Sequence, residues 1–212
     1  MMAWKASPEL RRWSGAAAEA PSASVDAALD QRLLAGAAGG NPAAFRGLVD
    51  RHLSAAVAIA RRMLRDDAEA EDIAQEAFLR LWRNAATIEI GPGGVRPWLR
   101  RVVSNLCIDR IRSARNTSVV AEVPEIAEPA SQDRTLEERD LSHRVDRALQ
   151  ALPERQRLAL VLFHYEGMTQ VEVGEVLGVT DEAVESLLAR ARRALKAGLK
   201  NEWQALLPGP VG

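Results

Sequence analysis

Hydrophobic residues recur with a helical period of three to four over most of the chain, and no segment alternates convincingly as a strand would. In the first half, the run Gly39-Gly40-Asn41-Pro42 separates two such patterns, because glycine ends helices, asparagine caps them and proline suits the first helical position. Residues 86–97 hold three glycines and two prolines and predict a loop. The predicted helices run from Asp30 to near Gly39, from Pro42 to about Leu64, from Asp66 to about Ala85 and from Trp98 to about Ala114.

The second half begins after a segment of different character. Residues 116–140 hold seven acidic residues against two basic ones, with Pro124 and Pro129, and predict a flexible linker. Helical patterning then resumes over 141–207, with breaks at Leu152-Pro153, Gly167 and Gly178. Residues 1–27, rich in Ala, Ser and Pro, predict a mobile tail. The expected fold class is therefore all-α, with two small helical domains at 28–115 and 141–207 joined by an acidic linker.

Composition narrows the choice of chemistry. Among 212 residues, 28 Lys and Arg nearly balance 29 Asp and Glu, so any affinity for nucleic acid must come from local segregation of charge. The single Cys107 cannot form an internal disulfide, and the three histidines have no zinc-site spacing, so we expect no metal and no cofactor. The longest apolar run, residues 53–60, is too short to span a bilayer, and residues 1–25 lack a signal-peptide hydrophobic region. A cytoplasmic protein without membrane insertion is expected.

The C-terminal half predicts a helix-turn-helix. Thr169 and Glu172 have the spacing of a capping box, in which each side chain bonds the other residue's amide. Gly178 suits the left-handed turn that ends a helix, and Thr180 suits the N-cap of the next. Two short helices joined by a tight turn containing glycine are typical of this motif.

The second of these helices has two distinct faces. The predicted buried face comprises Val184, Leu187, Leu188, Ala191 and Leu195. The opposite face comprises Glu182, Ser186, Ala189, Arg190 and Arg193. Taken alone, that face suits either a solvated surface helix or one that enters a DNA groove, where arginine reaches phosphates or guanine edges and glutamate accepts from cytosine.

Two helices of the first half carry further candidates. The helix from Trp98 has five arginines and one aspartate, which suits a phosphate backbone, and Asn105 suits a base edge; Asp109 and Arg112 could instead simply pair on the surface. The preceding helix is predicted to bury Ile73, Ala77 and Leu81. Its outer stripe of Asp72, Gln75, Glu76 and Leu79 suits either solvent or a docked protein.

Several motifs together resemble one family. They are residues 72–78 (DIAQEAF), Trp98-Leu99 followed by Asn105, Asp109 and Arg112, then Leu152-Pro153 and the helix-turn-helix that ends in Arg190-Ala191-Arg192. In this order and spacing, over roughly residues 30–200, the chain resembles an extracytoplasmic-function (ECF) sigma factor, from the two-domain group of the sigma-70 family of bacterial RNA polymerase.

The resemblance implies a transcription initiation factor that is not itself an enzyme. Asp72, Gln75, Glu76 and Leu79 would bind the β′ clamp helices of core RNA polymerase. The loop at 86–97 with Arg101, Asn105, Arg112 and Arg115 would contact the promoter −10 element. Glu185, Ser186, Arg190 and Arg193 would read the −35 element. An anti-sigma factor would control the protein.

The sequence also departs from the family's commoner pattern. The position of Glu185 often holds Lys or Arg, that of Leu187 often holds Arg, and Gly174 stands where Ala is usual. The −35 preference of the family therefore does not carry over to this chain. Two other functions are alternatives: a sigma mimic that sequesters an anti-sigma factor, and a stand-alone helix-turn-helix regulator. An enzyme is disfavoured because the GPGG run at 91–94 lacks a phosphate-loop lysine and no nucleophile has a partnered base.

Overall fold

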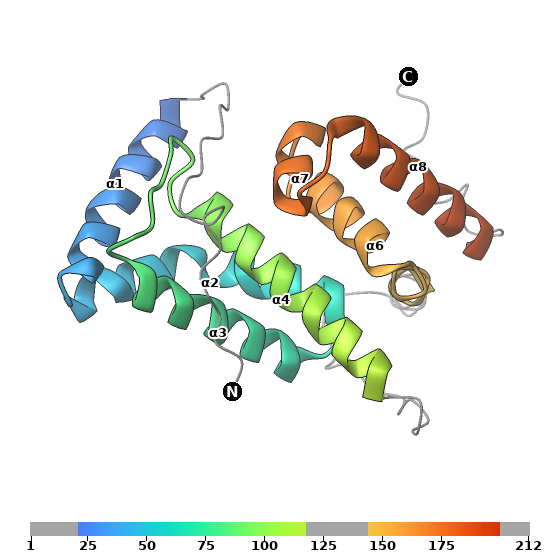
Figure 1. Cartoon of the computed structure of the whole chain (residues 1–212), viewed down its shortest axis with the longest axis horizontal. Coiled ribbons are helices and arrows are strands. Elements are labelled where there is room, and N and C mark those ends of the chain that lie inside the picture. Colours follow the sequence, from blue (N-terminus) through green and yellow to red (C-terminus); the bar gives the residue numbers. More distant parts are fainter. Residues whose placement is uncertain (1–20, 118–143, 200–212) are drawn as a thin grey trace, which may run out of the picture. The chain divides into compact units, whose positions relative to one another are not determined.

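The computed structural model describes residues 21–117 and 144–199, and every regular element within these ranges is helical (Figure 1). Residues 1–20 of the predicted tail and 118–140 of the predicted linker lie outside the described residues. Residues 144–150 are helical. The labelled elements are α1 (Pro21–Ala38), α2 (Pro42–Leu64), α3 (Asp67–Asn84), α4 (Arg96–Thr117), α6 (Glu154–Leu160), the π-helix η3 (Val161–Tyr165), α7 (Gln170–Leu177) and α8 (Asp181–Gly198).

Two compact units divide the described chain. One contains the residues up to Arg61 together with Ala68–Cys107, and the other contains Arg62–Asp67 and the residues from Ile108 onward. Within residues 21–117 and 144–199, no helix is long and apolar enough to cross a membrane. In the same ranges, no group of three or more His, Cys, Asp and Glu residues could hold a metal ion.

The first unit is built on the amphipathic faces that the sequence predicts. Asn41 caps α2, since its side-chain oxygen accepts the Ala43 amide at 2.9 Å. Aromatic rings join α2 to α3: Phe45 meets Phe78 and Trp82 edge-on, with ring centroids 6.4 and 4.9 Å apart. The predicted core positions of α3, Ile73, Ala77 and Leu81, are all buried. The apolar face of α4 is buried as well, namely Trp98, Leu99, Val102, Val103, Leu106 and Cys107. Burial raises the pKa of the Cys107 thiol to about 12, so this cysteine stays protonated.

The start of α1 differs from the prediction. The helix begins at Pro21, whereas the sequence pattern predicts a helix only from Asp30 and assigns residues 21–27 to the tail. The segment PSASVDAALD has little amphipathic pattern of its own. Long-range ion pairs fix this segment instead, because Asp26 and Asp30 both bind Arg51 of α2. Such tertiary contacts leave no local signal in the sequence.

The second unit packs its helices around Leu158, Leu162, Val173 and Leu188, all less than 2% exposed. Pro153 precedes α6, and α6 continues directly into η3, a π-helix that the sequence pattern does not predict. Gly167, with a φ of 65°, then ends this helical run, as the sequence predicts. The break leaves the chain free to begin α7 and α8, the two helices that carry the helix-turn-helix.

Candidate nucleic-acid interface

The predicted helix-turn-helix is confirmed bond by bond. Glu172 donates its amide to the Thr169 hydroxyl at 3.3 Å, and the Glu172 carboxylate accepts the Thr169 amide at 2.7 Å, which completes the capping box. Gly178 ends α7 in the left-handed conformation, with a φ of 64°. Thr180 then caps α8 by accepting the Ala183 amide at 3.3 Å. Local hydrogen bonds therefore fix where α8 begins.

Gly174 has a steric reason to depart from the commoner alanine. A Cβ atom at this position would lie 2.7 Å from the carbonyl oxygen of Val179, closer than real Cβ contacts allow. The Val179 amide also donates to the Gly174 carbonyl at 3.0 Å. The turn thus folds back directly onto the α7 backbone, and glycine makes room for this close approach.

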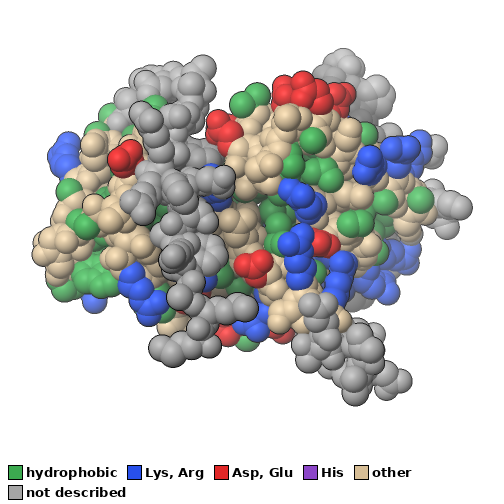
Figure 2. Space-filling view, in the orientation of Figure 1, with side chains coloured by type: hydrophobic (Ala, Val, Ile, Leu, Met, Phe, Trp, Pro, Cys, Tyr) green, Lys and Arg blue, Asp and Glu red, His purple; other side chains and the backbone are tan. Residues whose placement is uncertain are grey.

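α8 presents the predicted polar face to solvent. Val184, Leu188 and Ala191 are buried, and Leu187 and Leu195 are partly buried. The exposed residues include Glu182, Glu185, Ser186, Ala189, Arg190 and Arg193. Figure 2 shows acidic side chains over the start of α8 and Lys and Arg side chains farther along it. This charge order matches the helix dipole, so a DNA phosphate would find its basic partners in the later turns.

The arginines of α8 differ in their surroundings. Arg192 contacts the body of its own unit, with its guanidinium carbon 5.8 Å from the centroid of the Phe163 ring and Nη2 3.5 Å from His164 Nε2. Arg193 bonds only to the Ala189 carbonyl of its own helix, at 3.4 Å. Arg190 makes no hydrogen bond or ion pair with any described residue. Arg190 and Arg193 are therefore the arginines available to a ligand of this face.

Near the start of α8, Glu182 is held as a carboxylate. Hydrogen bonds from the Thr180 side chain and from its own amide keep the pKa of Glu182 below its ordinary value. A carboxylate near the first turn stabilises the helix, but it also repels phosphate. The beginning of this helix is therefore poorly suited to backbone contact.

The four candidates on α4 fall in two environments. Asn105 is exposed and Arg101 is partly exposed, both in the first unit. Arg112 and Arg115 belong to the second unit, where they pair with the Glu154 carboxylate at 3.3 and 3.0 Å while remaining more than half exposed. The Glu154 amide and Arg112 lower the pKa of this carboxyl against the opposing effect of burial. Exposed pairs of this kind contribute about 1 kcal/mol or less, so a phosphate can compete for these arginines.

The outer stripe of α3 is confirmed as a surface, with one qualification. Asp72, Gln75 and Leu79 are exposed, the last at 38%. Glu76 is partly buried, and its carboxylate accepts from Arg80 Nε at 2.8 Å, one helical turn away. An apolar side chain among hydrogen-bond acceptors thus faces outward, and Glu76 is held in place beside it.

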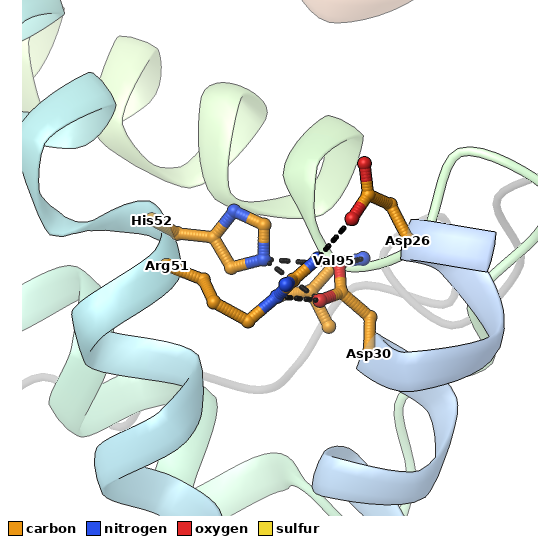
Figure 3. A network of polar contacts seen from close by, with 5 residues as sticks. All are labelled: Asp26, Asp30, Arg51, His52 and Val95. Carbon is orange, nitrogen blue, oxygen red and sulfur yellow. Dashed lines mark hydrogen bonds and ion pairs between the residues drawn. The ribbon is translucent and has the colours of Figure 1, made fainter. Parts of the chain in front are cut away.

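A buried carboxylate lies behind the loop that precedes α4, and sequence patterns do not reveal it. Asp30 is 2% exposed and binds Arg51, His52 and the Val95 amide (Figure 3). Burial opposes its charge, but the bonds from His52, Val95 and Arg51 outweigh burial and lower the pKa of Asp30. In the sequence, Asp30 is only an acidic residue at a helical position, and such residues are usually solvated. Its burial therefore has no clear signal in the sequence.

Comparison with known proteins assigns the chain to a family. Sigma-70 region 2 matches residues 48–117, and sigma-70 region 4 matches residues 142–195. The ECF RNA polymerase sigma factor SigM of Mycobacterium tuberculosis is 34% identical over 168 residues, which cover 78% of this chain and 82% of SigM. The chain belongs to the ECF sigma factors. The family resemblance inferred from the sequence motifs is thereby confirmed.

Other sigma factors are also similar to this chain in sequence or structure. SigW of Bacillus subtilis is 30% identical over 173 residues, which cover 76% of this chain and 92% of SigW. The probable sigma factor RfaY of Xanthomonas campestris is 34% identical over 182 residues, and the match spans 82% of this chain but only 44% of RfaY. Among solved structures, CnrH in complex with the cytosolic domain of CnrY has a TM-score of 0.58 and 30% identity over 81% of this chain and 97% of that one.

The fold is also found in a more distant sigma factor. RpoE of Bartonella quintana, in complex with the anti-sigma factor NepR, has a TM-score of 0.61 at 24% identity, over 74% of this chain and 98% of that one. The all-α fold of the ECF sigma factors is thus common to this chain and a protein of low sequence identity.

Proposed function

We propose that this ECF sigma factor binds core RNA polymerase and directs it to promoters through three surfaces. The α3 stripe binds the β′ clamp helices of the polymerase. The residues of α4, with the loop before it, contact the −10 element. The outer face of α8 reads the −35 element. RNA synthesis itself belongs to the polymerase, so we propose no cofactor for this chain. We place the chain in the cytoplasm, together with the polymerase and the promoter DNA.

The outer face of α8 is the observation that carries this proposal. A helix fixed at its start by Thr180 and Gly178 presents Ser186, Arg190 and Arg193 to solvent. A helix-turn-helix places its second helix in the major groove, with base contacts from one face. Arginine recognises guanine through two acceptors, and serine bonds to several bases, so this face suits sequence reading as well as phosphate binding.

The −10 surface suits bases that have left the duplex. Asn105 offers both a donor and an acceptor, and its exposure allows it to bond the edge of an unpaired base. Arg101 and the paired Arg112 and Arg115 supply positive charge along the same helix for the strand backbone. The combination supports the capture of a single strand rather than a closed duplex.

The α3 stripe suits a protein partner. Leu79 offers an apolar contact, and Asp72, Gln75 and Glu76 precede it with acceptors along the same stripe. Protein interfaces commonly combine apolar contacts with polar groups at their edge. We further propose control by an anti-sigma factor, since CnrH, which is 30% identical, is seen in complex with a protein domain.

The test is run-off transcription with purified bacterial core polymerase on a fragmented genomic library, mapping RNA 5′ ends with and without the protein. The proposal expects protein-dependent starts that share two upstream elements at fixed spacing. If the folded protein gives no new starts, initiation is excluded and a sigma mimic is favoured. Binding to duplex DNA without any binding to core polymerase would instead identify a stand-alone regulator.

Arg190→Ala tests the −35 surface. The variant should weaken binding to a matched −35 duplex by about 1 to 3 kcal/mol if Arg190 makes a bidentate base contact. Arg192→Ala is the matched control, because it removes the same charge from the same helix but from a side chain that contacts Phe163 and His164. Equal losses for both variants, measured by fluorescence anisotropy, would reduce the role of Arg190 to general electrostatics.

A further inference from the structure

Asp30 joins three elements of the first unit at one buried point (Figure 3). Its Oδ1 accepts from Arg51 Nε at 3.0 Å, and its Oδ2 accepts the Val95 amide at 3.0 Å. His52 Nε2 lies 3.0 and 2.9 Å from the two carboxylate oxygens. Asp30 comes from α1, Arg51 and His52 come from α2, and Val95 is the last residue before α4. Asp30 also precedes residues 48–117, which the region 2 match covers.

The bond to Val95 acts as a cap supplied from a distant helix. The Val95 carbonyl accepts the first bond of α4, from the Leu99 amide at 3.0 Å, so Val95 occupies the N-cap position. The Asp30 carboxylate satisfies the Val95 amide and places a negative charge beside the positive end of α4. A bond between a charged acceptor and an amide is among the stronger hydrogen bonds.

Gly94, the residue before Val95, leaves room for this contact. Gly94 has a φ of 66°, and a Cβ atom there would lie 2.5 Å from Asp30 Oδ2. The backbone therefore passes against the carboxylate at a distance that only glycine allows. At the other end of the loop, the Asn84 carbonyl accepts the amides of Thr87 and Ile88 at 2.8 and 3.1 Å.

The loop between α3 and α4 is thus attached at both ends and exposed in between. Gly94 and Val95 are buried, whereas residues 86, 87, 89, 92 and 93 are exposed. Asp30 binds the backbone of Val95 and not its side chain. The position of Asp30 therefore sets the position of the main chain at the end of the loop, and with it the path of the exposed loop residues. An error of about 1 Å in such a support is enough to impair a functional site.

We propose that Asp30 is a positioning residue for promoter recognition, which sets the path of the 86–94 loop and so its preference among −10 sequences. The inference rests on the proposed function, in which this loop and α4 contact the −10 element. Asp30 touches no DNA itself and acts through Val95. Its effect is therefore expected in the choice of −10 sequence, and not in polymerase binding or in −35 affinity.

The test uses the full chain with core polymerase on promoters that share one −35 element and are randomised at −10, with RNA 5′ ends sequenced. Asp30→Asn keeps the volume but turns an NH₂ group toward the donors, so one partner is lost. Asp30→Glu keeps the charge for Arg51 and His52 and alters the distance to Val95. If Asp30→Asn does not fold, Asp30→Glu carries the test alone.

Two controls separate positioning from stability. Asp26→Asn removes an equal charge from the same helix and network, but Asp26 is 66% exposed and bonds Arg51 only. Ile59→Ala opens a cavity at a residue that is 1% exposed, so it destabilises the unit while Asp30 and its three partners keep their side chains and bonds. Core binding and −35 duplex binding are measured for every variant.

The expected result is a change in the −10 preferences of both Asp30 variants. The ratio of the best to the median −10 sequence should fall about tenfold for Asp30→Asn, the effect of one charge-assisted hydrogen bond, and less for Asp30→Glu. Asp26→Asn should match the wild type, and Ile59→Ala should lower all promoters alike. The proposal is overturned if the Asp30 variants keep the wild-type preferences or only lower all promoters uniformly. Absence of protein-dependent starts with the wild type would instead refute the proposed function.

Discussion

Two turns lead into the helices that carry the candidate DNA-contacting residues, and they are built in different ways. The turn before α8 is fixed by neighbours in sequence, through the Thr169 capping box, Gly178 and the Thr180 cap. The loop before α4 is fixed by Asp30, which is 65 residues away from Val95 in the sequence. The first turn is encoded locally, while the second depends on the tertiary fold of its unit.

The largest expected difference in stability is between alanine substitutions at the glycines of the two turns. Gly94 and Gly178 both have positive φ, which costs any other residue about 1 to 2 kcal/mol. Open space surrounds Gly178, but a Cβ on Gly94 would meet Asp30. Gly94→Ala should therefore destabilise its unit by roughly 2 to 5 kcal/mol, since overpacking adds about 1 to 3 kcal/mol, and Gly178→Ala by only about 1 to 2 kcal/mol.

The measurement is hydrogen exchange followed by mass spectrometry, which gives the opening free energy of peptides from each unit separately. Peptides of the unit without the substitution serve as the internal control. Equal losses for the two glycines would mean that the Asp30 carboxylate yields to the added methyl group, and the contact would then be too soft to fix the loop.

Gly174→Ala tests whether the local turn is also sterically tight. The added methyl group would lie 2.7 Å from the Val179 carbonyl oxygen, and such overpacking is expected to cost about 1 to 3 kcal/mol. Gly198→Ala is the matched control in the same unit, since its methyl group would make an ordinary contact at 3.8 Å with Ala148. Exchange of α7 peptides should rise for Gly174→Ala only. An unchanged rate would leave Gly174 without a packing role.

Sequence reasoning succeeded where structure is local. The Asn41 cap, the capping box of Thr169 and Glu172, and the left-handed Gly178 follow from residue types at fixed spacing, and the structure confirms each of them. The exposure of Asn105, Arg190 and Arg193 follows equally well from helical period. Their roles toward DNA remain predictions.

Sequence reasoning failed where one element holds another. The early start of α1 and the burial of Asp30 both depend on partners in α2 and the α3–α4 loop, which no periodicity reveals. The pairing of Arg112 and Arg115 with Glu154 also joins residues about 40 positions apart. The glycine at position 174 is likewise explained by a close approach to the Val179 carbonyl, which the sequence does not show.

Thr180→Ala should moderately destabilise the start of α8, and Asn41→Ala should do the same to the start of α2 in the other unit. Each variant removes a side-chain acceptor from a helix start, which costs about 1 kcal/mol. The effect should appear in the exchange of the Ala183 and Ala43 amides respectively. Thr180→Ser and Asn41→Asp keep an acceptor and should restore protection. If Thr180→Ala leaves the start of α8 protected, the turn does not depend on local capping.

Acid should loosen the remotely anchored loop and spare the Asn41 cap. The folded pKa of Asp30 is lowered, so its carboxylate stabilises the unit above about pH 4, the unfolded value, and that contribution is lost as pH falls through the lower folded pKa. Protonation leaves one oxygen as an acceptor, so the effect is smaller than that of losing the side chain. Acid titration by NMR should shift the Val95 amide, while the Ala43 amide, bound to the neutral Asn41, should hardly move. A titrating Val95 signal with an ordinary midpoint would contradict the lowered pKa.

The smallest effect on stability is expected for a substitution of Ser104, which is, like Asp30, a buried polar residue of the first unit. Both side chains are buried, but the Ser104 hydroxyl has no hydrogen-bond partner among the described residues, whereas Asp30 has three. A buried polar group without a partner destabilises, so Ser104→Ala should leave stability unchanged or raise it by up to about 1 kcal/mol. Denaturant-dependent exchange of α4 peptides measures the difference. A marked loss of stability would reveal a bond to Ser104, and Asp30 would then not be the only buried polar side chain that holds this unit together.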